Sequence, residues 1–446
     1  MNKNKFLLPL LLLLLASCAS QRTSRRHNYQ TDAIQKVPAT VSVATPVVAE
    51  EEGGKDESVV SARPLVSQVR RAPQGTWQAA KQQALDELCR SSLFETTQLG
   101  LYVYDLTDGQ PLYAVNAAHR MRPASCQKIV TAVTALHYLK GDYQLRTDFR
   151  IRGKVVGGTL SGDLIVVGGM DPLVTQEELV QAAAAIKLKL GITSITGEVI
   201  YDLSMREDTP LGWGWCWDDD YGPLSALLVD GRDTFSQHWL KALAQAGIKT
   251  RSKGKVSSTR GATEGSTFVY TLRHSIDELL LPMMKQSDNI FAECLFYQIA
   301  ALGGKKGGGH KQVAERTEEL LRNIGLNPEP YRIADGSGLS LYNYVSAEML
   351  VALLGYAWQT EDIRQHLLTS LPVAGYDGTL QKRMVGTEAE GNVLAKTGTV
   401  TGISSLAGYL TTAGGHTLAF AIINQGVATS AAGRNFQDRV CRELCK

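Results

Sequence analysis

The sequence lacks an excess of either charge, since 46 lysine and arginine residues are matched by 44 aspartate and glutamate residues, a net charge of +2. Such a balance gives no reason to expect a nucleic-acid partner. A zinc-binding pattern is also missing, because Cys441 and Cys445 have neither a second cysteine pair nor histidines nearby. The glycine-rich stretch 168–172 lacks the Gly-Lys-Ser/Thr ending of a phosphate-binding loop and indicates a turn. We therefore predict neither a nucleic-acid partner nor a zinc site.

The apolar run at the N-terminus, residues 6–15, is shorter than the stretch of about 20 apolar residues that a membrane-spanning helix needs. Lysines precede it, and Leu15-Ala16-Ser17-Cys18 follows it. This pattern resembles a bacterial lipoprotein signal, so we predict that residues 1–18 are a signal peptide and that Cys18 becomes the lipidated first residue. Ordinary secretion with cleavage near Ala19 is the alternative. Either way we expect export to the periplasm or cell envelope, with the lipid on Cys18 as the predicted attachment to a membrane.

Residues 19–75 are rich in serine, threonine, alanine, proline and charge, and they lack an amphipathic period. This composition predicts a disordered tether. Cysteines of an exported chain can pair, and Cys89 with Cys441 or Cys445 is one hypothesis because the terminal helices are expected to be neighbours. Cys126 is expected to be a small core-facing residue rather than a catalytic thiol.

The remaining chain shows two different patterns of apolar residues and glycines. Residues 77–91 predict an amphipathic helix, and the two short apolar runs that follow predict a β-hairpin around Asp108-Gly109. After about residue 142, apolar residues alternate as in strands and glycine-rich turns become frequent. The opening therefore indicates an α+β fold with a β-rich insertion. We predict a domain made of residues 76–142 and 275–446, and an inserted β-rich domain made of residues 143–274.

Residues 123–128 carry the candidate nucleophile. Apolar residues recur with helical spacing after them, and Pro123 is tolerated in the first turn of a helix. Ser125 and Lys128 would then be neighbours on one helix, with Cβ atoms about 5–6 Å apart. A serine hydroxyl needs a base to take its proton, and a desolvated lysine with a lowered pKa can be that base. We therefore predict Ser125 as the nucleophile and Lys128 as its base.

A second motif, Ser287-Asp288-Asn289, lies between two predicted helices, where side chains can project into a cleft. A hydroxyl and an amide there can relay a proton and hold a substrate amide. Helix capping alone would also explain the triplet, because serine, aspartate and asparagine are favoured capping residues.

A third motif, Lys396-Thr397-Gly398-Thr399, precedes two runs that predict antiparallel strands. Lysine and threonine on a strand edge can bind a substrate carboxylate by charge and hydrogen bonds. Gly398 would let a ligand approach the backbone closely. The alternative is an ordinary turn at the end of a strand.

The order Ser-x-x-Lys, Ser-Asp-Asn, Lys-Thr-Gly is the signature of class A β-lactamases and penicillin-binding proteins. The 159 positions (287 minus 128) between Lys128 and Ser287 exceed what a compact β-lactamase holds. Residues 77–446 resemble the class C low-molecular-mass penicillin-binding proteins, the DacB-type D-alanyl-D-alanine carboxypeptidase/endopeptidase group. Other stretches share the resemblance: Gly169–Pro172, Asp335–Gly338, Leu371–Gly375 and Gly378–Leu380. The resemblance implies a serine β-lactamase/D,D-peptidase-like transpeptidase domain, an antiparallel sheet with flanking helices, with the β-rich domain inserted between the first two motifs.

The activity that the resemblance implies is serine-type carboxypeptidase or endopeptidase action on peptidoglycan stem peptides, with penicillin and other β-lactam antibiotics as inhibitors. Ser125 would form an acyl-enzyme after Lys128 takes its proton. Ser287, with Lys396 or Lys128, would pass a proton to the leaving amine. Water would then release the acyl group, and no metal or cofactor would be needed.

The resemblance also implies how the substrate is held. Asn289 would position the substrate amide, and Lys396, Thr397 and Thr399 would hold the terminal carboxylate, beside the exposed backbone of Gly398. Backbone N–H groups of Ser125 and Thr399 would form the oxyanion hole.

Two other functions fit the same fold: a β-lactamase, or a catalytically idle wall-binding lipoprotein. The inserted length argues against the first, as does Glu319, which lies inside a predicted surface helix rather than on a deacylation loop. The intact nucleophile, base and carboxylate site argue against the second. Trp213, Trp215 and Trp217, with Asp218–Asp220, could form a carbohydrate platform or a metal site, although packing and solvation are the commoner roles of such residues.

Overall fold

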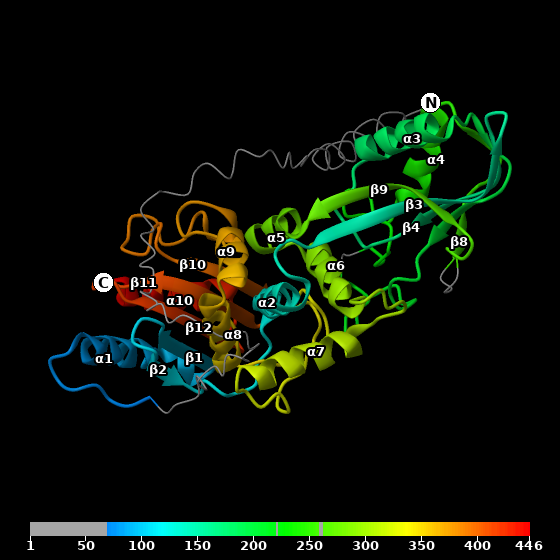
Figure 1. Cartoon of the computed structure of the whole chain (residues 1–446). Coiled ribbons are helices and arrows are strands. Elements are labelled where there is room, and N and C mark those ends of the chain that lie inside the picture. Colours follow the sequence, from blue (N-terminus) through cyan, green and yellow to red (C-terminus); the bar gives the residue numbers. More distant parts are fainter. Residues whose placement is uncertain (1–68, 220–221, 258–261) are drawn as a thin grey trace, which may run out of the picture. The chain divides into compact units, whose positions relative to one another are not determined.

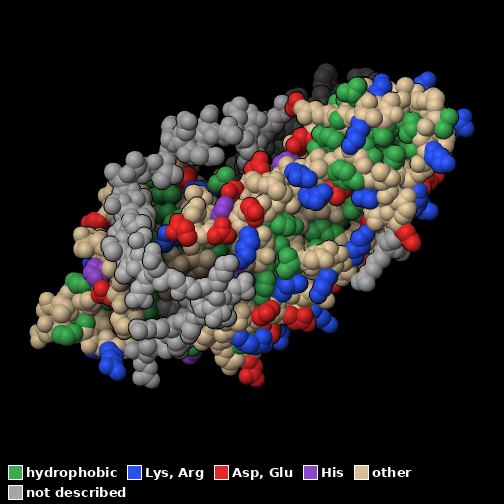
Figure 2. Space-filling view, in the orientation of Figure 1, with side chains coloured by type: hydrophobic (Ala, Val, Ile, Leu, Met, Phe, Trp, Pro, Cys, Tyr) green, Lys and Arg blue, Asp and Glu red, His purple; other side chains and the backbone are tan. Residues whose placement is uncertain are grey.

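The computed structural model of the chain describes residues 69–219, 222–257 and 262–446 (Figure 1). The predicted signal peptide, Cys18 and nearly all of the predicted tether lie outside these residues. Within the described ranges, no helix is both long enough and apolar enough to cross a bilayer. Side chains of both charge signs lie on the face that Figure 2 shows, in keeping with the balanced composition.

The first sheet has five antiparallel strands in the order β10-β11-β12-β1-β2. Side chains alternate between its two faces, and both faces are buried. On β12, Leu418 and Phe420 pack with α1 and α10, whereas Ala419 and Ala421 pack on the side of α8. The elements are β1 (Gln98–Asp105), β2 (Gln110–Val115), β10 (Leu394–Val400), β11 (Ile403–Thr411), β12 (Thr417–Gln425), α1 (Trp77–Cys89), α8 (Ala347–Gln359) and α10 (Ser430–Cys445).

Helix α2 (Gln127–Leu139) lies at the centre of the helical layer, and almost all of its residues are buried. The sequence predicted one core-facing side, but helices pack around α2 from several directions. The neighbours are α5 (Ile276–Lys285), α6 (Asn289–Ala300), α7 (His310–Asn323), α8 and α9 (Glu361–Ser370). The helix that follows Ser125 is therefore held firmly in place, because movement of α2 would disturb packing on all these sides.

A second sheet lies between the first two motifs in the sequence, with the order β7-β5-β4-β3-β9; β6 also pairs with β4, and β8 pairs with β6. The long strands β3, β4 and β9 are antiparallel, whereas the short strands pair in parallel. Helices α3 (Gln176–Leu190) and α4 (Phe235–Gln245) share its apolar core. The strands are β3 (Gln144–Val156), β4 (Thr159–Val167), β5 (Ser194–Ile195), β6 (Val199–Asp202), β7 (Lys249–Thr250), β8 (Lys255–Ser257) and β9 (Thr267–Ser275). The insertion is thus present, while its boundaries at 143 and 274 stay predictions.

The cysteine pairing suggested by the sequence is wrong. Helices α1 and α10 are neighbours, as expected, but Cys89, Cys441 and Cys445 are free thiols. Lys81 donates from Nζ to the carbonyl of Glu443 at 2.6 Å, so the end of α10 lies beside the start of α1. Cys89 is eight residues further along α1, which is about 12 Å of helix.

Candidate active site

Ser125 lies in a short 3-10 turn, Ala124–Cys126 (η3), that leads directly into α2. Lys128 Nζ donates to Ser125 Oγ at 3.2 Å. The serine is half-buried and the lysine is fully buried. The two residues that the sequence proposed as nucleophile and base therefore meet, in a geometry that lets a neutral amine accept the hydroxyl proton.

The turn that carries Ser125 depends on a close backbone contact. Ala124 has a positive φ of 47°, a conformation that alanine rarely adopts. Its carbonyl oxygen lies so near Gly338 that a Cβ there would come within 1.9 Å of it. Gly338 also has a positive φ, 84°. Glycine at 338 is therefore required by the loop's own backbone and by the turn below the nucleophile.

Lys128 has a complete set of acceptors. Besides Ser125, its Nζ donates to Asn289 Oδ1 at 2.6 Å and to the carbonyl of Ser337 at 2.8 Å. Burial lowers the pKa of Lys128 to about 8, although the charges of Asp335 and Glu293 act in the opposite direction. A lysine with this pKa is neutral in part of the population near neutral pH, so Lys128 can act as a base.

Glu293 is a buried carboxylate whose charge acts on Lys128, and it was not predicted from the sequence. Glu293 accepts hydrogen bonds from the backbone N–H groups of Gly336, at 3.1 Å, and Ser337, at 2.8 Å. Burial, followed by the charge of Asp335, raises the pKa of Glu293 to about 8. The available signal was a single acidic residue in the otherwise apolar α6, which indicates a buried polar role rather than a solvated one.

Asp335 organises the loop that contains Asp335–Gly338, one of the stretches that share the family resemblance. Its carboxylate accepts from the N–H groups of Gly338, at 2.8 Å, and Ser340, at 2.7 Å. Ser337 itself is fully buried, so its hydroxyl is not a second nucleophile. The loop instead supports Lys128, because it presents the Ser337 carbonyl to the lysine.

The second and third motifs form another serine–lysine pair. Lys396 Nζ donates to Ser287 Oγ at 2.8 Å and to the carbonyl of Thr397 at 2.8 Å. Ser287 has a positive φ of 62°, and Asp288 caps α6 by accepting from the N–H of Phe291. Burial, helped by the charge of Lys128, holds the pKa of Lys396 well below its usual range. Helix capping, the alternative explanation of this motif, therefore accounts for Asp288 but not for Ser287.

Strand β10 is fastened to the nucleophile turn. A Cβ on Gly398 would come within 2.7 Å of the carbonyl of Pro123 and within 3.0 Å of the N atom of Cys126. Cys126 Sγ donates to the carbonyl of Lys396 at 3.2 Å, so this cysteine faces inward as predicted. These contacts fix the third motif against Ser125 and explain the glycine through protein packing.

Two threonines complete the strand. Thr397 Oγ1 donates to Thr379 Oγ1 at 2.8 Å, and Thr399 is exposed. Because β10 is the edge strand of its sheet, an extended peptide can pair with it while these hydroxyls face the ligand.

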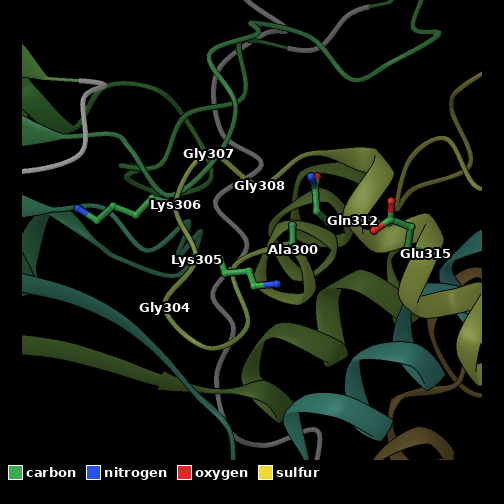
Figure 3. Close-up of a pocket in the computed structure, with 8 residues that line it drawn as sticks. All are labelled: Ala300, Gly304, Lys305, Lys306, Gly307, Gly308, Gln312 and Glu315. Carbon is green, nitrogen blue, oxygen red and sulfur yellow. The ribbon is translucent and has the colours of Figure 1, made fainter.

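Other candidate positions lie apart from this centre. Glu319 is exposed and accepts from the hydroxyl of Tyr138. A cavity of about 680 Å³ is lined by the glycine-rich loop between α6 and α7 (Figure 3). Lys306 in this loop pairs with Asp202 at 2.9 Å. None of the residues that line the cavity belongs to the three motifs: Ala300, Gly304, Lys305, Lys306, Gly307, Gly308, Gln312 and Glu315.

Two serine–lysine pairs with fully buried lysines lie beside an edge strand, on an antiparallel sheet flanked by helices, and describe a serine acyltransferase site. The model of the D-Ala-D-Ala carboxypeptidase 3 (S13) family matches residues 81–235 and 223–444, and the chain belongs to this family. The family resemblance that the motifs suggested is confirmed.

Individual relatives agree. The chain is 26% identical over 419 residues to the D-alanyl-D-alanine carboxypeptidase DacB of Haemophilus influenzae, covering 75% of this chain and 87% of that protein. It is 29% identical over 381 residues to the carboxypeptidase DacB of Mycolicibacterium smegmatis, covering 78% and 80%.

The crystal structure of penicillin binding protein 4 from Haemophilus influenzae superposes with a TM-score of 0.71 at 24% identity, covering 83% of this chain and 98% of that one. A peptidoglycan endopeptidase of Bdellovibrio bacteriovorus gives a TM-score of 0.53 at 18% identity, covering 78% and 92%. The predicted fold class, a D,D-peptidase-like α+β domain with an insertion between the first two motifs, is confirmed.

Proposed function

We propose that the chain is a serine-type D-alanyl-D-alanine carboxypeptidase/endopeptidase that cleaves peptidoglycan stem peptides through an acyl-enzyme on Ser125. Family membership supports the reaction class. The observation that carries the residue assignment is the 3.2 Å contact between Lys128 Nζ and Ser125 Oγ, made by a fully buried lysine with a lowered pKa.

In the acylation step, Ser125 Oγ attacks the carbonyl carbon between the two D-alanines while Lys128 Nζ takes the hydroxyl proton. Backbone N–H groups of Ser125 and Thr399 bind the oxyanion. The C–N bond then breaks, and the leaving amine receives a proton from Ser287, which is resupplied by Lys396 or Lys128. Water hydrolyses the resulting ester and restores the Ser125 hydroxyl.

Substrate positioning falls to the remaining motif residues. Asn289 holds the substrate amide while its own Oδ1 accepts from Lys128 at 2.6 Å. Lys396, Thr397 and Thr399 bind the terminal carboxylate at the edge of β10, where Gly398 brings the backbone close. Penicillin places a carboxylate and a strained amide in the same positions and leaves a slowly hydrolysed adduct; a β-lactam complex is known for the Haemophilus protein.

Labelling of the purified protein with a fluorescent penicillin, followed by peptide mapping, tests the assignment. We expect one adduct, on Ser125. A folded protein that forms no adduct, or forms it elsewhere, would overturn the proposed mechanism and favour the idle wall-binding scaffold. Release of D-alanine from a pentapeptide separates the peptidase from a β-lactamase, for which Glu319 offers no support because it is exposed and bonded to Tyr138.

We further propose that Cys18 is lipidated and that the protein is held in the cell envelope by this anchor, with residues 19–75 as its tether and residues 143–274 as a separate inserted domain. The lipoprotein-type pattern at Leu15–Cys18 supports the anchor. Mass spectrometry of the mature N-terminus would give a diacylglyceryl cysteine at Cys18. An unmodified N-terminus near Ala19 would contradict it and favour ordinary secretion.

A further inference from the structure

Three aromatic side chains near the catalytic loop are exposed without a packing role that accounts for all of them. Trp217 is 92% exposed, and Trp213 and Tyr342 are 40% and 44% exposed. The rings of Trp213 and Tyr342 are neighbours, and Trp217 follows Trp213 by four residues on the same loop. Burial of such side chains normally stabilises a fold, so exposed rings of this kind indicate a binding surface. We call these three residues the aromatic platform.

The platform is held in shape by its neighbours. Trp213 stacks on His310, with ring centroids 4.5 Å apart and planes inclined by 20°, and its centroid lies 5.2 Å from that of Tyr342. Gly214 has a φ of 81°, and a Cβ there would come within 2.6 Å of the Tyr342 ring. The backbone N–H of Leu341 donates to the carbonyl of Gly214 at 3.2 Å. The two loops that carry the platform are therefore joined to each other.

The same two loops lead to the catalytic centre. Trp215 donates from Nε1 to Asp335 at 2.9 Å, and Asp335 organises the loop whose Ser337 carbonyl accepts from Lys128. Tyr342 follows Ser337 by five residues, a length of chain that spans at most about 18 Å. Tyr342 is thus within that distance of the carbonyl that accepts from Lys128, and the loop of Trp213 and Trp217 is bonded to the same segment through Trp215 and Gly214.

We propose that the aromatic platform binds the glycan strand to which the stem peptide is attached. This inference rests on the proposed function, because it names a further part of that substrate. A pyranose ring has an apolar face of C–H groups that packs against the negative face of an aromatic ring, while its hydroxyls bond to polar neighbours. Asp218, next to Trp217, is exposed and can accept such hydroxyls.

The dimensions of the substrate agree with this assignment. A stem peptide joins the glycan through its N-terminus, several residues before the terminal D-alanines. Four extended residues reach about 14 Å. This reach is of the same order as the length of chain between Ser337 and Tyr342, so a peptide acylating Ser125 can carry its sugar toward the platform.

Two substrates test the inference: a pentapeptide ending in D-Ala-D-Ala, and the same pentapeptide carrying its disaccharide. The readout is the ratio of the two kcat/KM values for D-alanine release. We expect the wild-type protein to prefer the glycosylated substrate about fivefold and Trp217→Ala to bring the ratio near one. Trp217→Phe retains a ring and should keep most of the preference. Leu188→Ala, at an 86% exposed apolar position on α3, is the matched control and should behave as wild type.

A wild-type ratio of one, or an unchanged ratio in Trp217→Ala, would overturn the inference, and the latter is the result expected if the platform contacts a partner protein. Failure of the proposed function looks different, because neither substrate would release D-alanine and penicillin would not label Ser125. Binding of a peptide-free GlcNAc–MurNAc tetrasaccharide, measured by calorimetry, remains decisive in that case. Trp217→Ala should weaken this binding about fivefold, and equal binding by both proteins would refute the platform.

Discussion

The two serine–lysine pairs of the active site share a geometry and differ in their surroundings. Lys128 contacts Ser125 at 3.2 Å, and Lys396 contacts Ser287 at 2.8 Å. Both lysines are fully buried, and burial lowers both pKa values. Nearby carboxylates raise the pKa of Lys128 alone, and the charge of Asp335 has the largest effect among them. The pKa of Lys128 is therefore about 8, and that of Lys396 is held well below its usual range.

We infer from this difference in surroundings that the two lysines have different roles. Lys128 stays near the balance between its charged and neutral forms, as a general base should. Burial, and then the charge of Lys128, hold the pKa of Lys396 well below its usual range, which disfavours the ammonium form in the empty site. A substrate carboxylate that arrives beside Lys396 would favour the ammonium form, so binding of the carboxylate and uptake of a proton are linked.

Removal of the first hydroxyl should have the largest effect. Ser125→Ala leaves Lys128 without a nucleophile to activate, and we expect acylation by penicillin and D-alanine release to fall by about 10⁴-fold or more. The control is Ser252→Ala, since Ser252 also precedes a lysine but bonds to Glu198 on the inserted sheet. Unchanged turnover in Ser125→Ala would remove the first pair from the mechanism.

Removal of the second hydroxyl should cost less. Ser287→Ala interrupts the proton path to the leaving amine but leaves the nucleophile and its base intact, so we expect kcat to fall about 10²- to 10³-fold. Stopped-flow kinetics with a chromogenic β-lactam would measure acylation directly. If Ser287→Ala were as inactive as Ser125→Ala, the second pair would be part of the nucleophilic step itself.

The pH dependence of acylation should report Lys128. Below a pKa of about 8 the amine is mostly protonated and cannot accept the Ser125 proton. The acylation rate should therefore rise about tenfold per pH unit from pH 6 to 7 and level off above pH 8. A flat profile across this range, measured with the protein folded throughout, would mean that Lys128 is not the titrating base.

The smallest expected effect comes from Glu293→Gln. The negative charge of Glu293 raises the pKa of Lys128, so its removal should lower that pKa and move the rising limb to lower pH. The shift should be less than about one unit, since Glu293 itself titrates near pH 8 and is largely neutral below it. A shift to higher pH would contradict the arrangement of charges described here.

The first pair was accessible from the sequence because its members are three positions apart on one helix, where spacing dictates contact. The second pair joins residues 109 positions apart, and local reasoning does not place Ser287 beside Lys396. Only the order of the three motifs, carried by the family resemblance, brought them to one site.

What the sequence did not reveal depends on burial. Glu293 and Asp335 are charged residue types, and pattern reasoning assigns such residues to the surface unless a partner is known. Strands β5 and β7 have two residues each, too few for an alternating pattern to be recognised. The insertion was accordingly predicted from its long strands, while the short parallel pairings appeared only in three dimensions.

The free cysteines have a consequence for the order of folding and thiol oxidation. Cys126, Cys294 and Cys441 are fully buried, and burial raises the pKa of each of these thiols, so in the folded protein these three present almost no thiolate to an oxidant. The nascent chain has no such protection. If the chain is exported to an oxidising compartment, as we propose, its core has to close before these thiols are oxidised.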